Sequence, residues 1–345
     1  MRIAVYGASG YTGRLVVAEL ARRGLDVLLV GRDPERLRLA ATEAGAPGAA
    51  VRVAGLDEPA ALAEALRGSD GVISCVAPFT VHGEPVLRAA IAARCHYVDI
   101  SGEQPHTKYV HDAFGVEAER AGITVLPAAT DDGVPADLLA HLTAARVAPV
   151  DALVIAHRLS GGTMSRGTLN SMLANITAFT GGGLSFVDGQ WLADADGVPT
   201  SLVFPGDAAP VEVAGLAAPE LPGIPRHLPA RLVTAVVERE FLARLSAVAA
   251  AEVVASLPEG PDAEQRADSG FVLVADAVGV DGRRARGVLT GVDVYGSTAL
   301  IAVESIRRLV ADGAKPGVLA PAEAFDPADF LGFLTRHGVR WSVTG

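Results

Sequence analysis

Hydrophobic residues in the first third of the chain alternate between short continuous runs and helical spacing. The runs are residues 1–6, 26–30, 51–55, 71–76, 96–100 and 123–129. Between them apolar side chains recur every three or four positions, as Leu15, Val16 and Leu20 do. Continuous apolar runs are typical of parallel strands covered on both faces. Their alternation with helices predicts an α/β fold with a doubly wound parallel sheet of the Rossmann type.

The pattern changes near residue 150. Strands are expected at 152–159, 271–278 and 285–294, the last two joined by a hairpin turn at Asp281-Gly282. Helices are expected after the glycine-rich turn at 161–168, at 296–311 and at 325–340. Residues 180–229 are rich in Gly, Pro and Ala and predict a pocket-lining loop region or a linker. Together these elements predict a Rossmann domain at 1–132 and an α+β domain at 133–294.

A glycine-rich turn lies between the first strand and the first helix. It reads Gly7-Ala8-Ser9-Gly10-Tyr11-Thr12-Gly13. In this strand–turn–helix context, glycines let the backbone approach a pyrophosphate, and the helix N-terminus holds the phosphates. The sequence therefore predicts a dinucleotide site, with these candidate residues: Gly7, Ser9, Gly10, Tyr11, Thr12 and Gly13.

The end of the second strand distinguishes the two nicotinamide cofactors. An Asp or Glu there would bind the ribose 2′-hydroxyl of NAD, but the chain has Gly31 and Arg32. A guanidinium beside a small residue favours the 2′-phosphate of NADP(H). Asp33 precedes Pro34 and is expected to cap the next helix. Arg36 is either a second phosphate contact or a solvated side chain.

Two further strand ends supply candidate cofactor contacts. Leu56 and Asp57 follow the third strand, where the adenine lies in such folds, although Asp57 could equally be a helix cap. The fourth strand is followed by Val76, Ala77 and Pro78, which we expect on the nicotinamide side of the crevice.

Composition excludes several classes of function. The 345 residues carry a formal net charge of −11 and no long basic run, so nucleic acid is not an expected partner. No apolar stretch approaches the roughly 20 residues that a membrane helix needs. The first strand begins at residue 1, so we expect no signal peptide and a cytoplasmic protein. The two cysteines, Cys75 and Cys95, have no metal-ligand spacing, and no metal is expected.

Several motifs together resemble one family, the saccharopine dehydrogenase-like NADP-binding oxidoreductases, and within it the trans-acting enoyl reductase branch. Besides the glycine-rich turn and Gly31-Arg32, the matching stretches are residues 83–86, 97–103, 129–138, 161–169, 295–299 and 316–325. The resemblance implies a Rossmann domain, a sheet-containing substrate domain, and a C-terminal segment, 295–345, whose last helix returns to the Rossmann domain. It also implies a homodimer.

Two stretches depart from the family pattern. Thr130-Asp131-Asp132 stands where Gly-Phe-Asp is usual, so Asp132 is the aligned acid and Asp131 is additional. Val76-Ala77-Pro78-Phe79 stands where a Gly-Pro-Tyr ending is more usual, which removes a hydroxyl from the nicotinamide edge. Both departures concern the substrate rather than the cofactor.

Three residues are candidates for catalysis. Asp132 follows the sixth strand and could donate a proton or cap the next helix. Tyr295, at a glycine hinge, could hydrogen-bond a substrate carbonyl or pack at the domain junction. Arg166, at a helix N-terminus, could bind a carboxylate or a phosphate-bearing carrier arm.

The expected function is NADPH-dependent reduction of an activated C=C bond in a small or carrier-linked substrate. Few charged residues between 160 and 204 favour an apolar pocket for it. The alternative is reduction of a C=N or C=O bond in a polar amino-acid-like metabolite, for which Arg158, Arg166, Arg226 and Arg231 could bind carboxylates. An NADP-binding scaffold without chemistry is the non-enzyme alternative.

Overall fold

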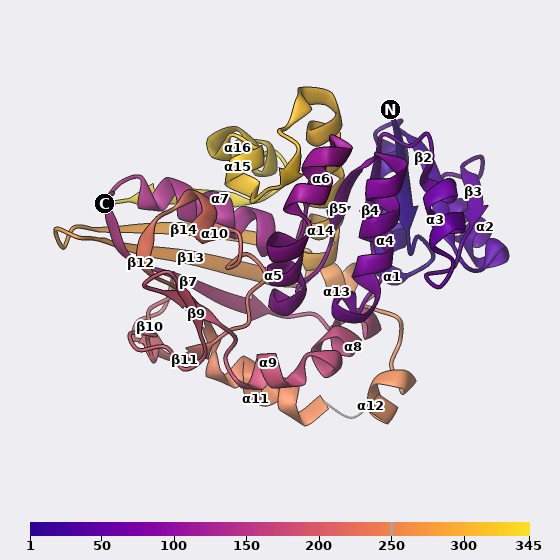
Figure 1. Ribbon diagram of the computed structural model, residues 1–345. Coiled ribbons are helices and arrows are strands. Elements are labelled where there is room, and N and C mark those ends of the chain that lie inside the picture. The colour runs from indigo at the N-terminus through magenta and orange to yellow at the C-terminus, as the bar shows by residue number, and fades with distance from the viewer. Residues whose placement is uncertain (249–250) are drawn as a thin grey trace.

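The computed structural model describes residues 1–248 and 251–345, which form two sheets with helices packed around them (Figure 1). The first sheet has seven parallel strands in the order β15-β6-β5-β4-β1-β2-β3. This order is that of a Rossmann sheet with one added edge strand, which confirms the predicted fold class. Its strands are β1 (Arg2–Tyr6), β2 (Asp26–Gly31), β3 (Ala50–Val53), β4 (Gly71–Ser74), β5 (His96–Asp99), β6 (Thr124–Leu126) and β15 (Gly317–Val318).

Helices cover both faces of this sheet because its central strands, such as β1 and β4, are buried on both faces. In β1, Ile3 and Val5 pack with α1 and α14, whereas Ala4 and Tyr6 pack with α3 and α4. The helices of this part are α1 (Tyr11–Arg22), α2 (Pro34–Glu43), α3 (Pro59–Leu66), α4 (Phe79–Ala93), α5 (Gln104–Ala113), α6 (Gly115–Ala121), α7 (Gly133–Ala144) and α14 (Val294–Arg308).

The second sheet is mixed, and in the described residues its main path runs β10-β11-β12-β7-β13-β14-β16. β12 and β7 are parallel, while β13 pairs antiparallel with both β7 and β14. The short pair β8–β9 adds to β12. The strands of this second sheet are β7 (Val150–Ser160), β8 (Ser185–Val187), β9 (Gln190–Leu192), β10 (Ser201–Leu202), β11 (Val211–Gly215), β12 (Ala230–Glu238), β13 (Gly270–Gly279), β14 (Arg284–Val292) and β16 (Arg340–Thr344).

Residues 180–229 are more ordered than the sequence predicted. The expected loop or linker contains strands β8 to β11 and a short helix, α10 (Ile224–His227). These strands are only two to five residues long, so their hydrophobic patterns are too short to recognise. Their place in the sheet comes from pairing, of β8 and β11 with β12, of β9 with β8 and of β10 with β11, rather than from local pattern.

The last helix was predicted too long. It is α16 (Pro327–Thr335), and residues 340–344 instead form β16, which pairs with β14 so that Trp341 lies opposite Leu289. Gly338, with φ +94°, separates the two elements. α16 packs on α7, and the helix that returns to the Rossmann sheet is α14, against α1, β4 and β5. α14 ends at Arg308, and a π-helical turn, Leu309–Gly313, follows it.

Short helices outside the two sheets complete the described structure. They are α8 (Arg166–Ala174), α9 (Ile176–Thr180), α11 (Arg239–Val248), α12 (Ala251–Ser256), α13 (Ala263–Ala267) and α15 (Pro321–Ala324). Figure 1 shows α8, α9, α11 and α12 below the sheets, with α14 in the middle of the molecule. No helix in the described ranges is both long and apolar enough to cross a bilayer.

Candidate active site

The glycine-rich turn closes tightly enough that side chains are excluded at its three glycines. A Cβ at Gly13 would lie 2.2 Å from the Gly7 carbonyl oxygen, and one at Gly10 would lie 3.2 Å from the same atom. Gly7 has φ +81° and packs against the backbone of Cys75. The glycines therefore let the first turn of α1 approach β1 and β4 closely.

The N-terminus of α1 is free to bind an anion. Its cap residue, Gly10, has no side chain to accept the first amide hydrogens, and no acidic residue lies in the first turn. Unpaired N–H groups and the positive end of the helix dipole favour a phosphate at this position.

The end of β2 presents an arginine as the sequence predicted. Arg32 is exposed, and no carboxylate within the described residues forms an ion pair with it. Asp33 accepts hydrogen bonds from the Glu35 and Arg36 amides at 3.0 and 3.1 Å, which confirms that it caps α2. Asp33 is thus occupied, and Arg32 is the group left to meet the ribose substituent.

In the turn after β3, Asp57 does not cap the next helix. The N-cap residue of α3 is Glu58, whose carboxylate accepts from the Gly55 amide at 3.0 Å. Asp57 is therefore not the cap, because the helix begins one residue later, at Pro59. Leu56 is half-buried and Asp57 exposed beside it, which leaves both as proposed adenine contacts.

The segment after β4 is held by a buried carboxylate that sequence reasoning did not single out. Glu103 accepts from the amides of Phe79 and Thr80 at 2.7 and 2.8 Å and so caps α4. Asn175, between α8 and α9, donates to the same carboxylate at 2.9 Å. Residues 75–78 lie just before this cap and are partly exposed, which fits the predicted contacts Val76, Ala77 and Pro78.

Two adjacent carboxylates follow β6. Asp131 is buried, and its Oδ1 accepts from the Thr298 hydroxyl at 2.8 Å. Burial, and then the neighbouring Asp132 carboxylate, raise the pKa of Asp131 well above its usual value. Asp132 lies at the N-cap position of α7 but does not cap it, because Thr130 accepts from the Gly133 amide. Asp132 instead accepts from the Thr130 hydroxyl at 2.5 Å.

Tyr295 connects α14 with the start of α8. Its hydroxyl oxygen accepts from the Ser165 amide at 2.6 Å and lies 3.1 Å from the Thr168 hydroxyl. Its ring packs edge-on against Tyr11, with centroids 5.1 Å apart. Tyr295 and Thr298 are three residues apart on one helix, so they share a face. This face thus carries the Tyr295 contacts with α8 and Tyr11 and the Thr298 contact with Asp131.

Arg166 lies at the same helix start as the Tyr295 contact. Its side chain is 37% exposed, and its guanidinium is 4.0 Å from the Glu259 carboxylate. The structure thus places Tyr295 and Arg166 together at the start of α8, whereas Asp132 lies after β6, at the N-cap position of α7.

A buried histidine–glutamate pair is a second feature that the sequence did not predict. His157 of β7 lies 2.8 Å from Glu220. Burial opposes a charge on His157, but Glu220, together with Asp132 and Asp131, outweighs it, and the pKa of His157 is raised. No local signal joins two residues that lie 63 positions apart.

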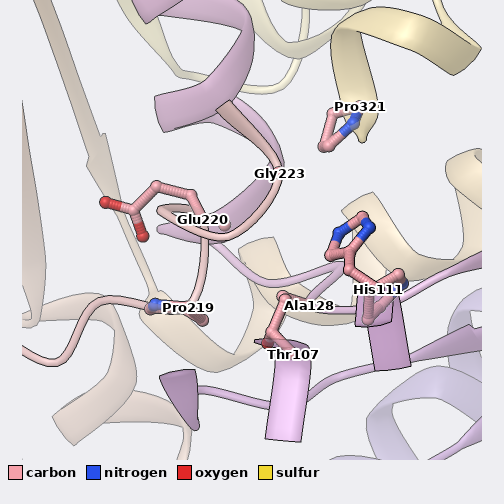
Figure 2. Close-up of a pocket in the computed structure, with 9 residues that line it drawn as sticks. Thr107, His111, Ala128, Pro219, Glu220, Gly223 and Pro321 are labelled. Carbon is pink, nitrogen blue, oxygen red and sulfur yellow. The ribbon is translucent and has the colours of Figure 1, made fainter. Parts of the chain in front are cut away.

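A small pocket lies beside Glu220, lined mainly by apolar and small residues. Figure 2 shows that Glu220 turns its carboxyl group away from His111 on the opposite wall. Burial, and then Arg226, lower the pKa of His111 to about 3, so this wall is uncharged. None of the three predicted catalytic residues lines the pocket. Nor do the described residues contain a group of His, Cys, Asp or Glu arranged to hold a metal.

The glycine cradle, the uncapped helix N-terminus and the exposed arginine after β2 fit a dinucleotide with a ribose phosphate. Together with the strand order they define a Rossmann-type nucleotide-binding protein with a second sheet domain. Residues 3–126 match the family model of the saccharopine dehydrogenase NADP binding domain. The N-terminal part of the chain is therefore an NADP-binding domain of the saccharopine dehydrogenase type, and its cofactor is NADP(H).

Two curated relatives and one solved structure illustrate the relationship. A saccharopine dehydrogenase-like oxidoreductase of Mus musculus is 29% identical over 206 residues, which are 55% of this chain and 44% of that protein. A trans-acting enoyl reductase of Mycobacterium ulcerans is 32% identical over 143 residues, 40% of this chain and 34% of that protein. The matches thus span less than half of either relative.

The structural likeness extends over the whole chain. Apo saccharopine dehydrogenase (L-Glu forming) from Saccharomyces cerevisiae matches with a TM-score of 0.64 and 16% identity, covering 100% of both chains. At this identity the likeness shows the fold, including the second sheet domain, and says nothing of the substrate.

Proposed function

We propose that this protein is an NADPH-dependent reductase of an activated C=C bond in a small or carrier-linked substrate. The choice of substrate class rests on ion pairs within the protein. A polar, amino-acid-like substrate would need four arginines to bind its carboxylates. Each of the four lies beside a carboxylate of the protein: Arg158 at Asp207 and Glu238, Arg166 at Glu259, Arg226 at Glu323, and Arg231 at Asp151. A substrate carboxylate would have to displace these partners, whereas an apolar acyl chain needs none of them. The enoyl reductase of Mycobacterium ulcerans supports the same class.

The carboxylate pair after β6 supplies the proton in this proposal. NADPH, when bound, provides the hydride that goes to the β-carbon. Burial and the neighbouring Asp132 carboxylate raise the pKa of Asp131 well above its usual value, which favours a proton on this site. Asp132, the more exposed of the two, delivers that proton to the α-carbon.

Tyr295 polarises the acyl carbonyl. The Ser165 amide donates to its phenol oxygen, and with the Thr168 hydroxyl, 3.1 Å away, as a second donor the phenolic hydrogen is left to donate to the substrate. Because Tyr295 and Thr298 share a face of α14, this hydrogen bond and the Asp131–Asp132 pair act on the same substrate. Arg166, at the start of α8, binds the phosphate of a carrier arm, whose higher charge and three acceptor oxygens displace the single Glu259 carboxylate 4.0 Å away.

Isotope transfer from labelled cofactor tests the reaction. The protein is incubated with NADPH deuterated at C4 and either an α,β-unsaturated acyl thioester or a cyclic imine acid. We expect NADPH oxidation with the thioester only, deuterium at the β-carbon of the product, and a solvent-derived hydrogen at the α-carbon. Turnover of the imine alone would overturn the proposed bond. Tight NADPH binding without turnover of either class would favour an NADP-binding scaffold.

Family analogy also supports a cytoplasmic homodimer. β16 is an edge strand of the second sheet, with alternating exposed side chains, and edge strands are commonly covered by a partner. Light scattering tests the dimer, and a monomeric mass would contradict it.

A further inference from the structure

A loop that precedes α13, residues 257–262, lies directly on the glycine-rich turn. The Tyr11 hydroxyl donates to the Pro261 carbonyl at 2.7 Å, and Gly260 packs against the Tyr11 ring. The carbonyl of Glu259 accepts from the Arg166 amide at 3.0 Å. The loop is therefore joined both to the start of α1 and to the start of α8.

The carboxylate of Glu259 lies among three arginines from three different helices. It is 2.8 Å from the guanidinium of Arg14, 3.5 Å from that of Arg36 and 4.0 Å from that of Arg166. Arg14 also donates to the Ser9 carbonyl at 2.9 Å, which holds its side chain over the turn. The other carboxylate near Arg14 is Glu43, at 3.9 Å.

Two of these arginines flank the position expected for the 2′-phosphate of the cofactor. The ribose of the adenosine half lies at the end of β2 in this fold. Arg36 lies in the first turn of α2, directly after β2, and Arg14 lies in the first turn of α1 beside it. Arg32 completes the set from the strand end itself. A carboxylate at Arg14 and Arg36 thus occupies cations that a ribose phosphate would otherwise bind.

We propose that Glu259 is an internal competitor of the 2′-phosphate for Arg14 and Arg36, and so sets how strongly the protein prefers NADPH to NADH. A phosphate monoester carries a charge of about −1.5 to −2 and three acceptor oxygens, so it displaces a single carboxylate. NADH has a hydroxyl at this position and leaves the Glu259 contacts in place. The inference concerns cofactor binding alone and is independent of the bond that is reduced.

Calorimetry with four ligands tests the proposal on the full chain: NADPH, NADH, 2′-AMP and 5′-AMP. The variant is Glu259→Gln, which keeps the size of the side chain and removes its charge. Glu264→Gln in α13 is the matched control, because Glu264 is exposed and lies in the first turn of the neighbouring helix. We expect Glu259→Gln to tighten NADPH and 2′-AMP by about threefold to tenfold, with a smaller gain at high salt. NADH and 5′-AMP should stay within about twofold of the unmodified protein.

Other results would overturn the proposal in distinct ways. Weaker NADPH binding by Glu259→Gln would mean that the carboxylate orients the arginines for the cofactor instead of competing for them. Equal tightening of 2′-AMP and 5′-AMP would mean a general effect of charge, as would the same gain in Glu264→Gln. Unchanged affinity for all four ligands would exclude Glu259 from the phosphate site. A melting temperature for each variant shows that the compared proteins are folded.

Discussion

The carboxylate of Glu103 accepts a hydrogen bond from the Asn175 side chain at 2.9 Å, and both residues are buried. The same carboxylate caps α4 through the amides of Phe79 and Thr80. One side chain therefore orders the segment after β4 and also connects it to the junction of α8 and α9. This contact couples the wall expected to hold the nicotinamide to the helix that carries Arg166.

Two substitutions separate the roles of this contact. Asn175→Ala removes the bond between the two segments and leaves the cap of α4 intact, so we expect a loss of about 1 kcal/mol in unfolding free energy. Glu103→Gln also leaves one buried amide without an acceptor, and we expect a loss of about 2–3 kcal/mol. Urea unfolding measures both. Equal losses for the two variants would show that the cap of α4 contributes nothing beyond the Asn175 bond.

A methyl group at Gly13 should abolish cofactor binding. Its Cβ would lie 2.2 Å from the Gly7 carbonyl, so α1 would have to move away from the turn that holds the pyrophosphate. Gly13→Ala should weaken NADPH binding by at least about 100-fold, because a helix N-terminus acts only at close range. Gly332→Ala in α16 is the control, since a Cβ there meets no atom within 4 Å, and its NADPH affinity should be unchanged.

Replacing the proposed catalytic groups should slow turnover but not cofactor binding. For Asp132→Asn we expect kcat to fall by about 100-fold, which is the contribution of a general acid. For Tyr295→Phe we expect a fall of about tenfold to 100-fold, because one hydrogen bond to the carbonyl is lost while the ring still packs on Tyr11. Tyr109→Phe, an exposed tyrosine bonded to Glu84, is the control. If neither catalytic variant slows turnover more than about threefold, the assignment of these residues is wrong.

Stability should depend on Glu304 in the acid range. Glu304 of α14 contacts Arg23 at 2.6 Å, and both Arg307 and Arg308 at 2.8 Å. Burial opposes its charge, but the three guanidinium groups outweigh burial and lower the pKa of Glu304 from 4.5 to about 2. A lowered pKa in the folded state gives stability that is complete above pH 4.5 and is lost as the pH falls toward 2.

The variant that tests this pH dependence is Glu304→Gln. We expect it to cost about 3 kcal/mol at pH 7, and we expect its difference from the unmodified protein to shrink at pH 3. Glu64→Gln is the control, because its ion pair with Arg67 is exposed on both sides. Urea unfolding at the two pH values measures the differences, and a cost that stays constant with pH would contradict the assigned pKa.

Local pattern was sufficient to predict the cofactor half of the molecule. The strand at 1–6, the three glycines and the helix after them are consecutive, so their geometry follows from backbone sterics within thirteen residues. Arg32 and Asp33 are likewise neighbours. The capping of α2 by Asp33 follows from Pro34, which comes directly after it. The class of cofactor depends on these short-range relationships.

Elements whose identity depends on distant partners were missed or mistaken. β15 has two residues and β10 two, so only pairing with β6 and β11 makes them strands. The stretch after Gly338 had helical neighbours in sequence, but pairing with β14 makes it β16. The hydrophobic pattern of such short segments covers too few residues to show a helical or strand period. Their conformation is set instead by hydrogen bonding to a sheet edge in the folded protein.

By itself, the sequence determined the Rossmann sheet, the glycine cradle and the arginine at the end of β2, because each depends on residues close together in the chain. Only the tertiary structure decided what surrounds that cradle. Glu103 meets Asn175 across 72 positions, and Glu259 meets Arg14 across 245. Such contacts have no local pattern, because they form only when the packing of both sheets brings distant loops together.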